Sequence, residues 1–227
     1  NASKYIINWA DQTIQAYDYI LSKYETIGIH DQFIINSKDK DGNIKNVTIL
    51  KPNGMKYIFE QDSKMFAMLN LIEIRDKNNN SITLTYELGV SVGLFSYTRL
   101  KNVTDNTSGR SLEFKYKTNT NFIESVSDNI GRKIQYNVNA NSVDLDDFTD
   151  AKNQRTQYLY GVNEKEKHLL KEVILPKGNR IINTYFNRKL KSSSNNQYNL
   201  KVDWNQNYFS GGNTNSTITS TQNGQSY

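Results

Sequence analysis

The sequence predicts an all-β protein made of tandem β-hairpins that form a continuous, spiralling antiparallel sheet. A composition with fifteen tyrosines and only two prolines favours strands over helices. A pattern of apolar residues, an Asp, a tight turn and alternating apolar residues recurs five times, at 71–86, 100–116, 123–138, 145–160 and 171–185. After each turn the apolar residues follow in steps of two, the period of a half-buried strand. Each copy therefore predicts one β-hairpin.

The turn of each copy has a recognisable chemistry. An Asp carboxylate can accept a hydrogen bond from the backbone two residues on, and Gly or Asn tolerates the positive φ that tight turns require. The turn residues are Asn79, Gly109, Gly131, Asn153 and Gly178. The Asp positions, at intervals of 29, 23 and 22 residues, are Asp76, Asp105, Asp128 and Asp150. In the fifth copy Pro176 stands near the position expected for Asp.

The second strand of each copy ends on an aromatic position. Seven residues after the turn residue come Tyr86, Tyr116, Val138, Tyr160 and Tyr185. At strand spacing, with a hydroxyl able to reach a partner, such tyrosines are expected in a wall or core. The alternative is a platform on which sugar rings stack.

Together these residues resemble a known repeat. The pattern apolar-x-x-V-x-D-x-x-G-R-x-x-x-x-Y is similar to the YD repeat, also called the RHS repeat, of bacterial Rhs proteins, the B and C subunits of insecticidal Tc toxins, and teneurins. A fixed period of this kind is typical of repeat architectures. The best matches are the copies that keep Asp, Gly and Arg in place, at Asp105, Gly109 and Arg110 and at Asp128, Gly131 and Arg132.

The resemblance covers residues 47–186 and implies both a fold and a role. YD-repeat sheets resemble a hollow shell wound from long hairpins that encloses a polypeptide. In the bacterial proteins this cargo is a C-terminal toxin domain, whereas in teneurins the shell is an extracellular adhesion scaffold. The expected structural positions of the repeat are Asp76, Tyr86, Asp105, Gly109, Tyr116, Asp128, Gly131, Asp150, Tyr160, Gly178 and Tyr185.

The two ends of the chain follow the pattern less closely. Residues 1–46 are predicted as a leading β-strand region, in which Asp41–Gly42 makes a hairpin turn. The segment 11–27 could form a helix, but its Thr, Ile and Tyr residues favour a strand. Residues 187–227 are predicted as a looser β and loop region, with a long loop or hairpin tip at 191–199, that runs into a further repeat near Gly224.

Charge and composition limit the classes of partner that can be expected. The formal net charge is +5, and Lys and Arg are densest at 165–171 and 187–191. These clusters fit an anionic partner or a solvated sheet face on which Lys discourages edge pairing, and the second is favoured, so no nucleic acid is expected. No apolar run approaches ~18 residues, so no membrane span is expected. The chain has no cysteine, which excludes disulfides and leaves the compartment open. It begins without Met, which suggests a fragment of a longer protein, and the resemblance implies that this protein is secreted or lies at the cell surface.

No cluster of reactive side chains stands out. His30 and His168 are far apart in the sequence and fit neither a metal site nor a catalytic triad. The acidic cluster 144–150 could suggest calcium, but it lacks the spacing of a calcium loop. The self-cleaving Asp site of the Rhs family has no counterpart. No cofactor, metal or catalytic residue is therefore expected, and the protein is not predicted to be an enzyme.

The sequence thus favours one function over two others. We expect a structural shell segment of an exported bacterial toxin, whose partners are the rest of the shell, its toxin cargo and subunits of a secretion or toxin complex. The alternative is a surface adhesion or carbohydrate-binding β-protein. A weaker third interpretation is an enzyme whose acidic residues come from several strands.

Overall fold

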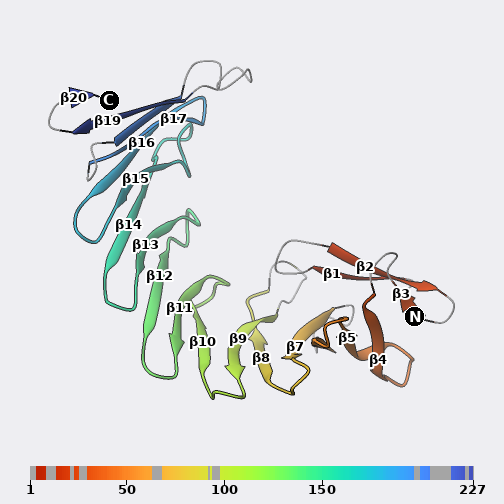
Figure 1. Cartoon of the computed structure of the whole chain (residues 1–227). Helices are drawn as coiled ribbons and strands as arrows, with labels where there is room; N and C mark the ends of the chain where they lie inside the picture. Colours follow the sequence, from red (N-terminus) through yellow and green to blue (C-terminus); the bar gives the residue numbers. More distant parts are fainter. Residues whose placement is uncertain are drawn as a thin grey trace. The chain divides into compact units, whose positions relative to one another are not determined.

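The computed structural model describes residues 4–8, 14–20, 23–25, 30–62, 68–91, 93, 98–196, 200–204, 216–222 and 225–226. All regular secondary structure in this described part of the chain is β-strand, which confirms the predicted all-β class (Figure 1). The chain divides into two compact units, the first comprising residues 1–121 and 127–131 and the second 122–126 and 132–227. This division passes through the third copy of the repeat.

The first unit holds two sheets. A three-stranded sheet has the order β1-β2-β3, and the strands that follow pair antiparallel, each with the next along the chain, from β4 to β10. The strands are β1 (Lys4–Asn8), β2 (Ile14–Ile20), β3 (Lys23–Glu25), β4 (Gln32–Lys38), β5 (Ile44–Leu50), β6 (Lys56–Gln61), β7 (Leu69–Arg75), β8 (Ser81–Leu88), β9 (Thr98–Asp105) and β10 (Ser111–Tyr116). The described residues of the segment 11–27, which could have been a helix, form the strands β2 and β3, as predicted.

The second unit repeats the same meander. From β12 to β20 each strand again pairs antiparallel with the next. The strands are β12 (Lys133–Val138), β13 (Leu145–Thr149), β14 (Arg155–Tyr160), β15 (Leu170–Ile174), β16 (Arg180–Phe186), β17 (Lys189–Asn195), β18 (Leu200–Trp204), β19 (Ser216–Gln222) and β20 (Gln225–Ser226). Strand β11 (Ile123–Asp128) contributes residues to both units.

The well-buried apolar residues gather beneath the three-stranded sheet. Among the described residues, the buried hydrophobic side chains are Tyr17, Ile44, Val47 and Ile49. Tyr17 comes from β2, whereas the other three come from β5, so the small sheet packs on one face of the first hairpins. Rings of β1, β2 and β4 meet there, with the Tyr17 and Phe33 centroids 5.2 Å apart.

A buried carboxylate joins the same two sheets. Asp31, whose side chain is 3% exposed, accepts hydrogen bonds from Lys51 Nζ at 2.6 Å, Gln15 Nε2 at 2.9 Å and the Tyr17 hydroxyl at 3.2 Å. Burial alone would raise the pKa of Asp31, but the hydrogen bonds from Lys51 and Gln15 outweigh it and lower the pKa. Burial and the Asp31 charge raise the pKa of the Tyr17 hydroxyl, which therefore remains a donor.

The C-terminal region differs from its prediction. The segment expected as a long loop, 191–199, is strand up to Asn195, because Lys189–Asn195 pairs with both β16 and β18. Ser and Asn are poor strand formers, but pairing on both sides supplies the backbone partners that outweigh this propensity. The turn predicted at Gly224 lies outside the described residues.

Candidate functional site: the tyrosine–leucine ladder

The turns of four copies share one backbone geometry, in which a residue with a positive φ donates its N–H to the carbonyl of the residue three positions before it. Asn79, Gly131, Asn153 and Gly178 have φ of 67°, 90°, 61° and 83°. For example, Asp76 N donates to Asn80 O at 2.9 Å and Asn79 N donates to Asp76 O at 3.2 Å. This is the three-residue hairpin loop that ends in a left-handed residue. The second copy has a turn one residue longer, because Gly109 N, at a φ of 71°, donates to Asp105 O at 2.8 Å and Asp105 N donates to Arg110 O at 2.8 Å.

The Asp side chains cap these turns. Asp76 Oδ1 accepts from the backbone N of Asn78 at 2.7 Å and of Asn80 at 2.9 Å, and Asp150 binds Lys152 and Gln154 in the same way, each at 2.8 Å. In the other two copies Asp105 caps Thr107 and Ser108, and Asp128 caps Ile130.

Two turns differ from the repeat pattern defined from the sequence. Asp39, not counted among the copies, caps Asp41 and Asn43 at 2.9 and 2.8 Å, and the signal was present as an Asp three residues before Gly42. In the fifth copy the Asp position is occupied by Leu175 and not Pro176, because Gly178 N donates to Leu175 O at 2.8 Å. That turn therefore lacks a carboxylate cap.

The tyrosines at the ends of the second strands bond to the start of the preceding strand. The hydroxyl of Tyr86 donates to Leu71 O at 2.7 Å, that of Tyr116 to Leu100 O at 2.6 Å and that of Tyr185 to Leu170 O at 2.8 Å. Tyr160 is hydrogen-bonded to the backbone of Leu145. We call these pairs the tyrosine–leucine ladder. In the copy that ends in Val138 no hydroxyl is available for this bond.

Three of the ladder tyrosines, Tyr86, Tyr160 and Tyr185, also stand at a β-bulge. Tyr86 is opposite Leu100 while Thr85 is opposite Asn102, so β9 has one extra residue there. The same shift occurs between Leu159 and Tyr160 and between Thr184 and Tyr185. It also occurs at Val138, which lacks the hydroxyl. A bulge increases the local twist of a strand pair, so the repeat includes a regular source of curvature.

The ring environments fix the tyrosines further. Burial raises the pKa of the hydroxyls of Tyr86, Tyr116, Tyr160 and Tyr185, which keeps them protonated as donors. The Arg99 guanidinium lies 4.0 Å from the centre of the Tyr116 ring. Lys171 Nζ lies 5.5 Å from the centre of the Tyr185 ring. Cations over ring faces add a modest attraction and occupy those faces.

Side chains near the turns remain open on the ladder face. Ile82 and Leu112 lie on the same faces of their strands as Tyr86 and Tyr116, and they are 39% and 43% exposed. No described residue of the repeat copies, 71–185, is among the buried hydrophobics. The ladder face is thus ordered by hydrogen bonds near the tyrosines and exposes apolar side chains near the turns.

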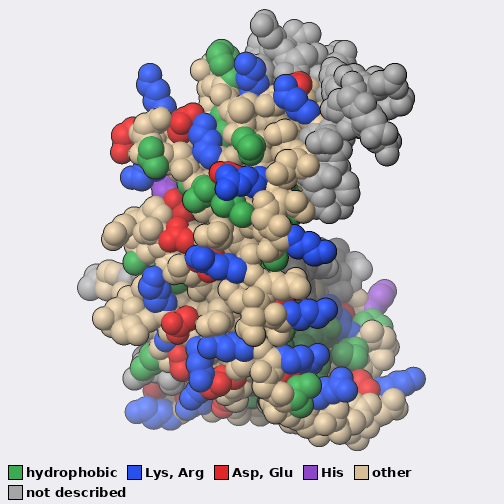
Figure 2. All heavy atoms as spheres, turned by 90° about the vertical axis from the view of Figure 1, so that its left-hand side faces the viewer, with side chains coloured by type: hydrophobic (Ala, Val, Ile, Leu, Met, Phe, Trp, Pro, Cys, Tyr) green, Lys and Arg blue, Asp and Glu red, His purple; other side chains and the backbone are tan. Residues whose placement is uncertain are grey.

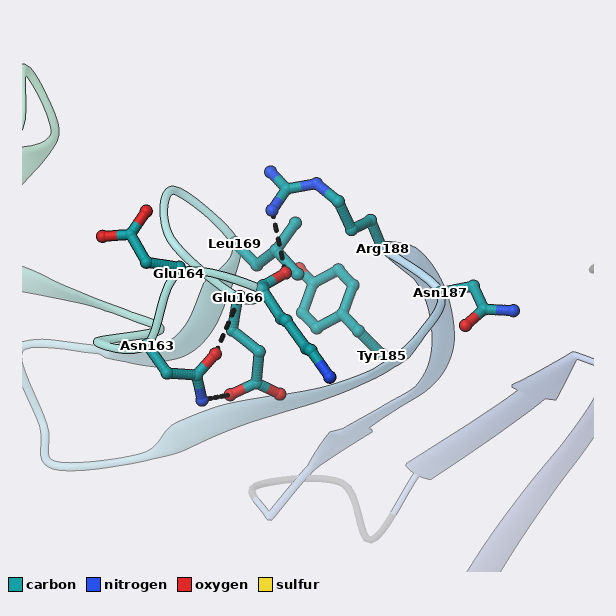
Figure 3. Close-up of a pocket in the computed structure, with 8 residues that line it drawn as sticks. Asn163, Glu164, Glu166, Leu169, Tyr185, Asn187 and Arg188 are labelled. Atoms are coloured by element: carbon teal, nitrogen blue, oxygen red, sulfur yellow. Dashed lines mark hydrogen bonds between the residues drawn. The ribbon is translucent and has the colours of Figure 1, made fainter.

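A depression of about 890 Å³ lies beside the ladder in the second unit (Figure 3). Tyr185 and Leu169 are at its centre, and Arg188 donates to the carbonyls of Lys165 and Lys167 at 2.8 and 3.1 Å. Figure 3 shows Glu164 and Asn187 pointing away from each other at opposite ends. The depression is a seam between two connecting loops, with no convergent set of polar groups in it.

The acidic cluster and the histidines do not form a common site. Asp144 Oδ1 lies 2.9 Å from His168 Nδ1, Asp147 accepts from Arg155 at 2.8 Å, and Asp150 caps its turn. His30 is exposed. Among the described residues no group of three or more His, Asp or Glu could hold a metal ion.

Charged side chains are interspersed on the surface. Figure 2 shows Lys and Arg distributed over the face drawn, with Asp and Glu between them. Ion pairs join the two signs, for example Arg99 with Glu87 at 2.8 Å and Arg180 with Glu172 at 2.9 Å. In the described part of the chain, no helix has the length and the apolar character needed to cross a membrane.

The comparisons with known proteins do not identify a family for this chain. A scan against protein-family models finds no match, and a search of curated protein sequences finds none either. Among solved structures, the chain is similar to a porin-like protein from Bacteroides uniformis ATCC 8492, with a TM-score of 0.35 and 9% identity over 94% of this chain and 89% of that one. A likeness at this level carries no argument about function.

Proposed function

We propose that this chain is a structural segment of a YD-repeat shell from an exported bacterial toxin, and that its ladder face lines the space that holds a C-terminal toxin cargo. The observation that carries the proposal is the tyrosine–leucine ladder. The hydroxyls of Tyr86, Tyr116 and Tyr185 each donate to a carbonyl at the start of the preceding strand, in copies that share few other residues. A β-bulge stands beside this bond at Tyr86 and Tyr185.

The ladder gives a physical reason why the sheet could form a wall without a compact core behind it. The hydroxyls of Tyr86, Tyr116 and Tyr185 each join the two strands of their own hairpin at its open end, so each hairpin is stabilised within the plane of the sheet. The apolar side chains near the turns need no second layer for order, and Ile82 and Leu112 stay partly exposed. A mixed, partly apolar face is what a lumen that holds an unfolded or inactive polypeptide requires.

The carbohydrate-binding alternative is less well supported. A sugar-stacking platform needs open aromatic ring faces. Here Arg99 lies over Tyr116, and Lys171 lies over Tyr185. The hydroxyls of Tyr86, Tyr116 and Tyr185, which could bind a sugar, donate instead to backbone carbonyls.

The proposal is tested first on the parent gene and then on its product. The reading frame downstream of Tyr227 should contain many more copies of the repeat and then an unrelated C-terminal domain. In the purified full-length protein, that domain should resist protease until the shell is denatured. A frame that stops soon after Tyr227, or a C-terminal domain cut as fast as the isolated domain, would contradict the shell.

A further inference from the structure

The three-stranded sheet has an open edge above an apolar groove. The groove has a volume of about 860 Å³, within the range of about 300–1,000 Å³ that ligand sites occupy. It is lined by β1 on one side and by β5, β6 and β7 on the other. Both sides belong to the first unit, in which the small sheet packs over these strands (Figure 1). We call it the β1 groove.

The lining shows that the groove follows the edge of β1 and not one of its faces. Four consecutive residues, Lys4, Tyr5, Ile6 and Ile7, border it. Successive side chains of a strand point to opposite faces, so four in a row can border one cavity only along the strand's edge. Among the described strands β1 pairs with β2 alone, which makes it the edge strand of its sheet.

The floor of the groove is apolar and comes from successive strands of the larger sheet. Val47, Phe59 and Leu69 belong to β5, β6 and β7 and lie beneath β1. An edge strand presents a row of backbone N–H and C=O groups. An apolar floor beside such an edge is the arrangement that binds an added strand, because main-chain bonds supply affinity and alternate side chains enter the floor.

The charge of the groove restricts the partner further. Lys4 is the single charged residue among the described residues that line it. Lys4 Nζ lies 3.4 Å from Asp18 Oδ1, with both side chains 49% exposed. Such a surface ion pair is worth little, so Lys4 can also meet an acidic group of a ligand.

We propose that the β1 groove binds an extended segment of a partner polypeptide as a fourth strand on the three-stranded sheet. The segment has apolar side chains at alternate positions and an acidic residue at the end near Lys4. The proposal rests on the first unit alone and does not depend on the shell function, so either can fail without the other.

Fluorescence anisotropy with the 227-residue chain tests this proposal. The probe is a fluorescein-labelled peptide, Glu-Val-Thr-Ile-Thr-Leu-Thr, and the control peptide has the same composition in the order Glu-Thr-Thr-Thr-Val-Ile-Leu. We expect saturable binding of the alternating peptide, at least about tenfold weaker binding of the control, and a comparable loss when alternate peptide nitrogens are methylated.

Two variants locate the site. Met68 lines the groove and is 49% exposed, so Met68→Glu adds a charge there without disturbing a buried core. Leu88, 55% exposed and outside the groove, provides the matched control Leu88→Glu. Met68→Glu should raise the Kd at least about tenfold, whereas Leu88→Glu should leave it unchanged. The absence of binding up to about 1 mM, equal binding of the two peptides, or equal effects of the two variants would overturn the proposal.

Discussion

Replacing Gly131 with larger residues measures the conformational cost of the repeated turn. Gly131 has a φ of +90°, and a Cβ built on it meets nothing within 4 Å. The cost of substitution therefore comes from the backbone and not from packing. A left-handed conformation costs an L-residue about 1–2 kcal/mol, so Gly131→Ala should destabilise by that amount. Gly131→Val should cost about 2–3 kcal/mol, because a β-branched side chain tolerates the conformation least.

An asparagine at this position provides the matched control. Asn79 and Asn153 occupy the equivalent positions of their copies at φ of 67° and 61°. Gly131→Asn should therefore cost less than the alanine variant, under about 1 kcal/mol. Urea unfolding at pH 7, followed by far-UV circular dichroism, gives the free energies of unfolding. With a slope of about 2 kcal/mol/M, the valine variant should lower the midpoint by roughly 1 M. If valine and asparagine variants unfold at the same urea concentration, the positive-φ explanation of the turn is wrong.

Three further perturbations test other contacts. Gly161→Ala should destabilise by a steric route, because its Cβ would lie 2.4 Å from Glu166 O; a circular dichroism melt unchanged from wild type would refute this contact. Tyr116→Phe should cost about 1 kcal/mol, because it removes the hydrogen bond to Leu100 O. Tyr185→Phe should cost less, because Asn183 Nδ2 also donates to Leu170 O at 3.0 Å and leaves that carbonyl with a partner. Equal losses of unfolding free energy in urea would contradict the ladder. Hydrogen bonds from Asn80 to Asp76 and from Ser108 to Asp105 lower the pKa of both carboxyls. The stability that these two carboxylates give to the folded chain is therefore complete above about pH 4, and it is lost as the pH falls through the lowered pKa values. The double variant Asp76→Asn, Asp105→Asn should therefore lose less stability between pH 4 and 2 than wild type. If the melting temperatures of the two proteins fall equally over that range, these caps are not the source of the acid-sensitive stability.

The hairpins could be predicted because their causes are local. An Asp, a short polar turn, a Gly or Asn and alternating apolar residues lie within a few positions of one another, and each acts on its own backbone. Asp76 and Asp150 show this most clearly, since their caps involve residues only two and four positions away. The one displaced position, Leu175 for Pro176, arose in the copy without an Asp to fix the alignment.

The ladder could be predicted only in part. The tyrosine spacing was visible, but the acceptors were not, because Leu71 and Leu100 are 15 and 16 residues from Tyr86 and Tyr116 in sequence. The bulges were hidden as well, since an extra residue in a strand leaves the apolar alternation of its partner unchanged. The strand at Lys189–Asn195 has no β-propensity signal and forms because two neighbours pair with it.

The sequence by itself determined the class of structure, the repeat and its turns, since these depend on propensity and on hydrogen bonds within a few residues. The tertiary structure alone decided where the apolar residues become buried. The small sheet β1-β2-β3 covers the first hairpins and brings Tyr17 and Gln15 to Asp31, whereas the described hydrophobic side chains of the repeat copies stay partly exposed. The physical reason is that every strand offers similar half-apolar faces, and only the packing of segments distant in sequence determines which face is covered.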